Sequence, residues 1–215
     1  MAMGRHFLIA ALGMAWVVGA AGVAAAEAEV ERGEKLYGLC AQCHGESGEG
    51  SPLALAPAIA GLPVWYVEPQ LQHFRSGIRG LHPDDVGGLR MHPMSLTFKR
   101  DEDIRAVAAF VASLPPVAQT RTVEGGDAAQ GATRYALCAA CHGQDGAGNE
   151  QMKAPRLVDT GDWYLLTALQ KYRTGIRGSN PGNPNGAVMR SFAAQLDDQA
   201  ILDLVAYINT LPGSK

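Results

Sequence analysis

Apolar residues recur at helical spacing through much of the chain. Ile104, Val107, Ala108 and Val111 follow the i, i+3, i+4, i+7 pattern of one buried helix face. Segments of this kind predict helices over residues 29–39, 65–76, 101–114, 128–137, 163–174 and 197–211. No stretch alternates apolar and polar residues as a half-buried strand would. The pattern therefore predicts an all-α fold.

The N-terminus has a different pattern. Arg5 precedes an apolar stretch over residues 7–23, and three alanines then precede Glu27. This order is typical of a secretory signal peptide with an A-x-A cleavage site, so we expect a signal over residues 1–26 and export from the cytoplasm. The alternative is an uncleaved anchor, because the apolar run approaches the ~18–20 residues that span a bilayer. No later window is apolar enough to span, so we expect no transmembrane segment after signal cleavage.

The rest of the chain is a tandem repeat. Residues 31–91 align with 129–189 at an offset of 98 without a gap, and 24 of the 61 pairs are identical. Beyond this stretch the second copy is one residue shorter, so the offset becomes 97. A proline-rich segment and a later pair of glycines separate the two copies. We therefore expect two domains, over residues 27–115 and 127–215, joined by a linker over 116–126.

Composition and charge narrow the function classes. The chain is 47% hydrophobic and 18% charged, with a net charge of −3. It has no basic excess to bind a phosphate backbone, so we expect no nucleic-acid partner. The apolar fraction is sufficient to fill a core, which argues against disorder.

A cysteine motif occurs once in each copy. Cys40-Ala41-Gln42-Cys43-His44 recurs as Cys138-Ala139-Ala140-Cys141-His142. C-x-x-C-H is the attachment signature of c-type haem, in which both thiols bond the haem and the histidine binds its iron. We expect two covalently bound haem c groups, attached at Cys40 and Cys43 and at Cys138 and Cys141, with His44 and His142 as iron ligands.

Three alternatives explain less of the motif. A thioredoxin-like C-x-x-C needs a βαβ context, which neither copy offers, and has no need of the histidine. Four cysteines could bind one zinc, but the two pairs lie 98 residues apart. Two disulfides would suit an exported chain, yet they leave the paired histidines unexplained.

A second iron ligand is indicated by the repeat. Met91 follows His44 by 47 positions, and Met189 follows His142 by the same number. Methionine is a known axial partner of histidine, so we expect His/Met ligation of both irons. Two other residues of the first copy compete: Met94 is replaced by Phe192 in the second copy, and His92 is replaced by Arg190, which cannot ligate.

Other repeated residues are candidates for haem contacts. The carbonyls of Pro57 and Pro155 could orient the histidine rings, although ordinary turn prolines would look the same. Repeated aromatic and arginine side chains could bind the haem propionates, the alternative being core packing and solvent exposure. These are Trp65, Tyr66, Arg75 and Arg79 with their partners Trp163, Tyr164, Arg173 and Arg177.

Together these motifs give the chain a family resemblance. Each half carries C-A-x-C-H-G, a glycine-rich loop, F/Y-R-x-G-x-R-G, a methionine and a final helix ending in A-F/Y. The whole mature chain resembles the dihaem class I c-type cytochromes of the cytochrome c4 family. The resemblance implies two tandem cytochrome c-like domains, each a small helical fold around one covalent haem, that relay electrons in the periplasm. The first copy departs from the pattern by offering two methionines.

The expected ligation of the two irons indicates the function. A His/Met iron has no open position for substrate, so we expect an electron carrier rather than an enzyme. Expected partners are a donor, such as a quinol-oxidising complex or dehydrogenase, and an acceptor, such as a terminal oxidase or reductase. One alternative is a cytochrome subunit of a periplasmic dehydrogenase that oxidises sulfur compounds or alcohols. Another is a dihaem enzyme such as a peroxidase, against which the repeated methionines argue.

Overall fold

The protein is built from helices. The computed structural model describes residues 7–213, with side chains from residue 22 onward. Its helices are α1 (Phe7–His44), α2 (Val64–Arg75), α3 (Val86–Ser95), α4 (Asp101–Ser113), α5 (Ala128–His142), α6 (Asp162–Arg173), α7 (Pro184–Ala193) and α8 (Asp198–Ile208). Between residues 7 and 213, β-pairing is limited to isolated bridges from Ser51 to Ala56 and from Asn149 to Ala154. The all-α prediction is confirmed.

The helices form two units with the same internal packing. In the first unit α1 packs on α4, and in the second α5 packs on α8. Gly33 and Gly131 lie at these two crossings, where an added Cβ would stand 2.0 Å from the carbonyl oxygens of Ala106 and Asp203. Any side chain there would push the paired helices apart, which explains a glycine at this position of both repeats.

Each unit has its own hydrophobic core. In the first, Tyr37 of α1 packs with Ile104, Val107 and Val111 of α4. These three apolar α4 residues lie on the face that the sequence pattern predicted to be buried. In the second unit, Tyr135 of α5 packs with Ile201, Leu204 and Val205 of α8.

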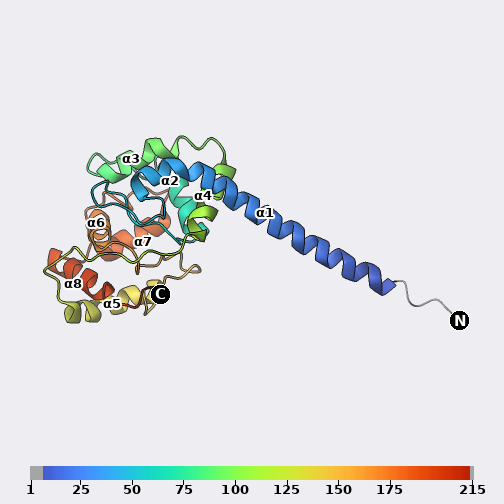
Figure 1. Cartoon of the computed structure of the whole chain (residues 1–215). Helices are drawn as coiled ribbons and strands as arrows, with labels where there is room; N and C mark the ends of the chain where they lie inside the picture. The colour runs from blue at the N-terminus through green and yellow to red at the C-terminus, as the bar shows by residue number, and fades with distance from the viewer. Residues whose placement is uncertain (1–6, 214–215) are drawn as a thin grey trace.

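Helix α1 is much longer than predicted. It runs unbroken for 38 residues, from Phe7 in the predicted signal peptide into the first domain, and ends at His44. Its N-terminal part projects away from the rest of the molecule (Figure 1). Residues 1–6, the charged start of the predicted signal, lie outside the described residues. Within the part of the chain that the structure describes, no helix combines the length and apolar character needed to cross a membrane.

Two helices were not predicted. Helices α3 and α7 follow the arginine-glycine segment of each repeat. Gly87, Gly88 and Pro93 lower the helix propensity of α3. It forms because Asp85 caps its first turn by accepting from the Gly88 N–H, and Asn183 caps α7 in the same way through Gly186. These short capped helices carry the candidate methionine ligands.

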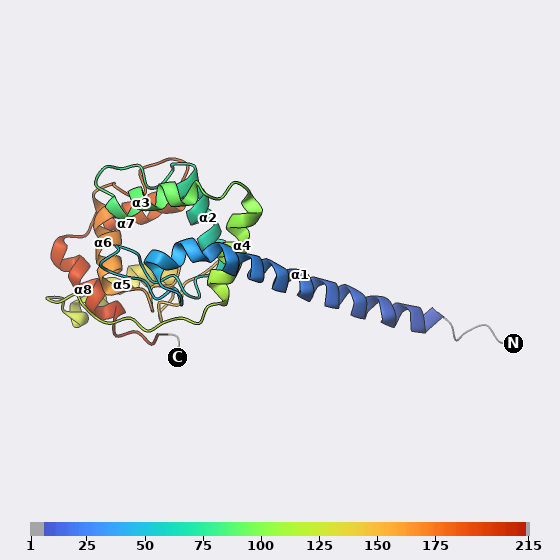
Figure 2. The same ribbon diagram turned by 45° about the horizontal axis from the view of Figure 1, so that its top comes forward.

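The two units lie against each other (Figures 1 and 2). The chain between α4 and α5 has no helix. Its later part is bound to the second unit, because Thr122 and Val123 donate backbone hydrogen bonds of 2.6 and 2.9 Å to the Asp162 carboxylate at the start of α6.

Candidate functional site

The two C-x-x-C-H motifs form the last turns of α1 and α5. Cys40, Cys43 and His44 stand at i, i+3 and i+4, so they share one side of the helix. Both cysteines of the second motif are placed in the same way on α5. None of the four cysteines forms a disulfide, so the two-disulfide alternative has no support in the structure. Among the described side chains, no three His, Cys, Asp or Glu residues gather as a metal site, so the four-cysteine zinc alternative has no support there.

Each motif histidine is buried and bonded to one backbone carbonyl. His44 Nδ1 lies 2.8 Å from the Pro57 carbonyl oxygen, and His142 Nδ1 lies 2.7 Å from that of Pro155. Because a carbonyl can only accept, Nδ1 must carry the proton, which leaves the Nε2 lone pair for a metal. Burial lowers the pKa of both histidines and outweighs the opposing effect of the carbonyls. The neutral form that ligates iron is therefore favoured.

A tight loop holds the chain around each histidine. Tyr37 donates its hydroxyl to the Gly45 carbonyl, and Tyr135 donates to the Gly143 carbonyl, both at 2.8 Å. In the second unit, the Gly148 N–H donates to the His142 carbonyl at 2.8 Å. Gly148 has φ +88°, and an added Cβ would stand 2.6 Å from the Arg156 nitrogen. Only glycine allows so close a return of the loop over the histidine.

The candidate methionines lie on α3 and α7. Met91 and Met189 are half-buried, and both line the same cavity as the motif histidines. Met94 and its counterpart Phe192 also border this cavity but are more exposed. His92 Nδ1 is engaged by the Phe74 carbonyl at 2.6 Å. The equal spacing from the motif histidines favours Met91 over Met94.

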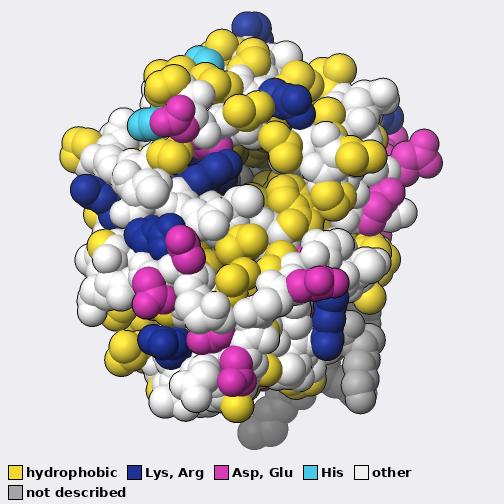
Figure 3. Space-filling view, turned by 90° about the vertical axis from the view of Figure 1, so that its left-hand side faces the viewer, with side chains coloured by type: hydrophobic (Ala, Val, Ile, Leu, Met, Phe, Trp, Pro, Cys, Tyr) yellow, Lys and Arg dark blue, Asp and Glu magenta, His cyan; other side chains and the backbone are white. Residues whose placement is uncertain are grey.

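The cavity has a volume of about 880 Å³ and is lined by residues of both units. Its wall includes Cys40, Cys43, Cys138 and both proline carbonyl residues, whereas Cys141 does not border it. Figure 3 shows hydrophobic side chains gathered around a hollow on one face of the molecule. A mainly apolar wall with thiols and a neutral histidine suits a flat, hydrophobic, iron-bearing group.

A cationic and phenolic cluster lies where the units meet. Arg177 donates to the hydroxyls of Tyr164 at 3.3 Å and Tyr66 at 3.4 Å. Arg79 donates to Tyr164 at 3.2 Å and to Gln70 at 2.7 Å. Burial would raise the pKa of Tyr164, but the charges of Arg177 and Arg79 lower it. The cluster thus favours negative charge within it.

This cluster provides an independent test of whether haem fits. Arg177 is only 6% exposed, and the Nε atoms of Arg177 and Arg79 are buried without a partner among the described residues. Buried guanidinium groups need anionic partners, and the haem propionates would supply them beside the cavity. The residues present therefore fit two haem groups. Haem supplies an iron that alternates between the ferric and ferrous states.

The other predicted propionate contacts are placed differently. Arg75 pairs with Asp101, and Arg173 pairs with Asp198 at 2.5 Å, so both arginines hold the start of the last helix in their unit. Neither borders the cavity. These contacts favour Arg79 and Arg177, rather than Arg75 and Arg173, as propionate partners. Trp65 and Trp163 do border the cavity and pack edge-on against Tyr66 and Tyr164.

Three residues at the interface were missed by the sequence analysis. Lys171 of α6 binds Asp85 at 2.7 Å, and Arg156 donates to the carbonyls of Ala60 and Gly61. All three contacts join the two units. None of these residues is identical in the other repeat, which is why a search for repeated residues passed over them.

Fold and site together define a class. Two helical units each end a helix in C-x-x-C-H, fix the histidine through a proline carbonyl and place a methionine on the same cavity. This is the arrangement of a dihaem c-type cytochrome.

Comparison with known proteins agrees with this class. A sequence model described as cytochrome c matches residues 30–115 and 128–212. The chain is 30% identical to cytochrome c4 of Azotobacter vinelandii over 203 residues, covering 90% of this chain and 94% of that protein. It is 31% identical to the thiosulfate dehydrogenase electron acceptor of Stutzerimonas stutzeri, covering 87% and 93%. The crystal structure of reduced recombinant cytochrome c4 from Pseudomonas stutzeri superposes with a TM-score of 0.67 at 28% identity, covering 85% and 98%.

The chain belongs to the cytochrome c family, as a dihaem class I cytochrome of the cytochrome c4 type. It carries two covalent haem c groups and transfers electrons.

Proposed function

We propose that this protein is a periplasmic carrier that relays single electrons and catalyses no reaction on a bound substrate. The observation that carries the proposal is the repeated pairing of histidine and methionine. His44 with Met91, and His142 with Met189, border one cavity at identical sequence spacing. An iron with both axial positions filled by the protein offers no position to oxygen, peroxide or substrate.

The roles of the other site residues follow from their contacts. Cys40 and Cys43 would hold one haem, and Cys138 and Cys141 the other. The Pro57 and Pro155 carbonyls orient the histidine rings by the bonds of 2.8 and 2.7 Å. Arg79 and Arg177, with the hydroxyls of Tyr66 and Tyr164, would bind propionates. One haem-bearing domain then occupies residues 27–115 and the other 127–215, with 116–126 as linker.

A shared cavity wall supports relay between the two haems. Residues of both units line the cavity, and the arginine cluster contacts both. Such a wall would bring the two groups close enough for electrons to pass between them without a mobile intermediate. The donor would deliver one electron at a time, and an oxidase or reductase would accept it.

The expected signal peptide supports a location of the protein in the periplasm. We propose that residues 1–26 direct export and are removed, which fits attachment of c-type haem outside the bacterial cytoplasm. Protein sequencing of the purified protein from its N-terminus tests this: a start at Glu27 is expected, whereas a start at residue 1 or 2 would mean that the leader is retained.

A second candidate is a cytochrome subunit of a dehydrogenase. The observation in its favour is the 31% identity to a protein named as a thiosulfate dehydrogenase electron acceptor. Native mass measurement separates the two. A free carrier has the mass of one haem-loaded chain, whereas a subunit co-purifies with a catalytic partner.

Carbon monoxide tests the proposed ligation and the absence of an open site. The reduced haem-loaded protein is mixed with the gas and its visible spectrum is recorded. We expect no change at neutral pH, because methionine occupies the position that the gas would need. A spectral change in the unaltered protein would reveal an open iron and favour an enzyme.

A further inference from the structure

The two repeats differ in charge at two pairs of equivalent positions near the cavity. The offset of 98 pairs Asp85 with Asn183 and Lys171 with His73. Asp85 and Asn183 cap the methionine-bearing helices α3 and α7. Lys171 and His73 lie on the equivalent helices α6 and α2. One pair is therefore ionic and the equivalent pair is not.

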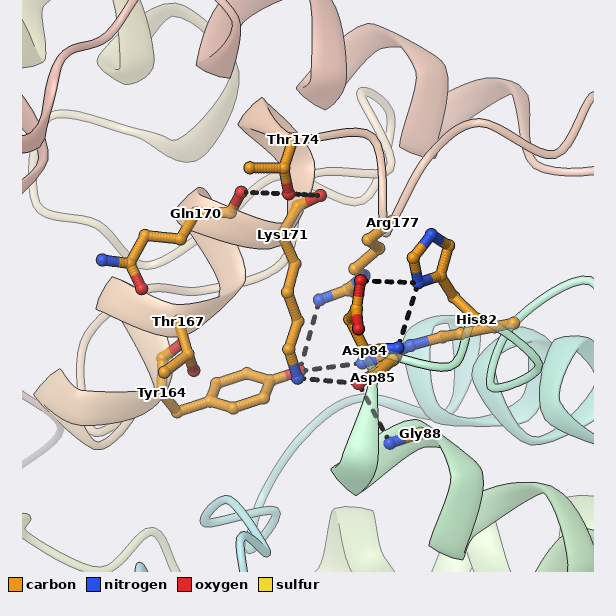
Figure 4. A network of polar contacts seen from close by, with 11 residues as sticks. His82, Asp84, Asp85, Gly88, Tyr164, Thr167, Gln170, Lys171, Thr174 and Arg177 are labelled. Atoms are coloured by element: carbon orange, nitrogen blue, oxygen red, sulfur yellow. Dashed lines mark hydrogen bonds and ion pairs between the residues drawn. The ribbon is translucent and has the colours of Figure 1, made fainter.

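The ionic pair joins the two units next to the cavity. Lys171 Nζ of the second unit lies 2.7 Å from Asp85 Oδ1 of the first (Figure 4). Asp85 is 3% exposed and also accepts from the Gly88 N–H at 3.0 Å. Burial raises the pKa of Asp85, but Lys171, the Gly88 N–H and Arg79 together lower it further, so the carboxylate is ionised. A buried charge of this kind is weakly screened by salt.

The residues at the equivalent positions, Asn183 and His73, form no ion pair. Asn183 caps α7 by accepting from the Gly186 N–H at 2.9 Å, which reproduces the geometry of Asp85 with a neutral side chain. His73 Nδ1 is buried without a hydrogen-bond partner among the described residues. Burial and the charges of Arg79 and Arg177 lower the pKa of His73, which favours its neutral form.

We propose that the Lys171–Asp85 pair sets the balance of charge beside the first haem, whereas the uncharged residues at the equivalent positions give the second haem no such balance. The ion pair attaches the methionine-bearing helix α3 to the second unit and places a buried carboxylate at the start of that helix, where α7 has the neutral Asn183. The proposal rests on the haem ligation proposed above. Both residues of the pair border the cavity, as does Asn183. A negative charge near an iron stabilises its ferric state and a positive charge its ferrous state, so each partner offsets the other only while both are present.

Two nearly isosteric substitutions test this in the haem-loaded protein. Asp85→Asn keeps the helix cap, because asparagine is as good a cap as aspartate, and leaves Lys171 unpaired. We expect the ratio of ferrous to ferric first haem at a fixed potential to rise about tenfold, or about 59 mV for a one-electron couple. The second haem should change less than threefold. Asn183→Asp is the matched control and should lower the ratio at the second haem instead.

Lys171→Gln should shift the potential of the first haem in the opposite direction. It leaves the carboxylate unpaired and should lower the ferrous fraction of the first haem, while the double variant Asp85→Asn/Lys171→Gln should return close to the original value. Potentials are read by optical titration, with the two waves assigned in a Met189→Ala background. Equal shifts of both haems in Asp85→Asn, or no shift at the first, would overturn the proposal. A near-infrared methionine band that accounts for fewer than two irons in the unaltered protein would instead overturn the proposed ligation.

Discussion

One tyrosine hydroxyl in each unit bonds the loop that follows the motif histidine. Tyr135 is 1% exposed, and its hydroxyl is bonded to the Gly143 carbonyl. Tyr135→Phe removes this donor, and the half-buried Gly143 carbonyl then keeps only its 3.2 Å bond from the Gly146 N–H. We expect a loss of about 1 kcal/mol in the free energy of unfolding, measured by denaturant titration.

Tyr207→Phe is the matched control for that loss. Tyr207 packs on Tyr135 at 5.1 Å between ring centroids, and its counterpart Phe110 makes the same contact with Tyr37. The fold therefore accepts phenylalanine there, and we expect a change within about 0.5 kcal/mol. Equal losses in both variants would show that ring packing, rather than the hydroxyl, is responsible.

The methionine ligands are tested by truncation. Met189→Ala should open one iron to carbon monoxide or azide and lower its potential, because methionine favours the ferrous state. The readouts are the visible spectrum with added ligand and a redox titration. Met152→Ala, at a side chain that is 53% exposed, is the control and should leave both unchanged.

The first unit needs its own comparison because it contains two methionines. Met91→Ala should reproduce the Met189→Ala result at the other iron, whereas Met94→Ala should not. If Met94→Ala opens the iron and Met91→Ala does not, the ligand of the first haem is Met94.

Repetition located the candidate haem-binding residues but could not assign every role. The motif cysteines, the histidines and both methionines were found because each occurs twice at the same spacing. Arg75 and Arg173 also occur twice, yet they pair with Asp101 and Asp198. A residue shared by two repeats can serve their common folding as well as their common ligand, and only contacts separate these roles.

At the scale of elements, periodicity succeeded where a helix has a wide apolar face. Helices α4 and α8 have such a face and were predicted within a few residues of their observed bounds. Helices α3 and α7 have ten residues each, and their few buried positions include the cap-contacting glycines Gly88 and Gly186. Their caps and the surrounding tertiary packing stabilise them, and neither contributes to the periodic pattern.

The start of α6 is an element whose stability depends on pH. Asp162 is 1% exposed and accepts from the backbone N–H groups of Thr122, Val123 and Trp163. Burial raises its pKa, but these hydrogen bonds lower it below the usual value. Stabilisation by the ionised group is therefore complete above the unfolded pKa of about 3.9 and is lost as the pH falls through the lower folded pKa.

Asp162→Asn should reveal this dependence. We expect a loss of about 1–3 kcal/mol above pH ~5, which shrinks as the solution is acidified, measured by urea unfolding across the pH range. Asp197→Asn is the control, because asparagine can replace aspartate as the cap of α8. A loss that stays constant down to acid pH would contradict an ionised Asp162 as its source.

At the scale of the whole molecule, the units differ in charge. Residues 27–115 contain 12 acidic and 8 Lys or Arg residues, a net of −4, whereas residues 116–215 contain 9 of each. Negative charge stabilises ferric iron, so we expect the first haem to have the lower potential, by roughly 10–40 mV after salt screening. Redox titration of Met91→Ala and Met189→Ala assigns each wave. A higher potential in the first unit would show that the local surroundings of each haem outweigh domain charge.

The contact between the units could not be predicted from the sequence. Arg156, Lys171 and Asp85 join the units, but the residues at the equivalent positions of the other repeat are different. Each unit could be predicted from its own pattern, because its core is formed by residues close to one another in that pattern. Packing between the units depends on which surfaces meet, and the spacing of apolar residues within each unit does not indicate this.

The central claim is that both irons are closed by histidine and methionine, which makes the chain an electron carrier. A redox titration of the purified haem-loaded protein, followed at the near-infrared band of methionine-ligated ferric haem, tests it most directly. We predict two one-electron waves of equal amplitude, each accompanied by loss of half of that band on reduction. A band that accounts for only one iron, or a wave without any change in it, would contradict the account.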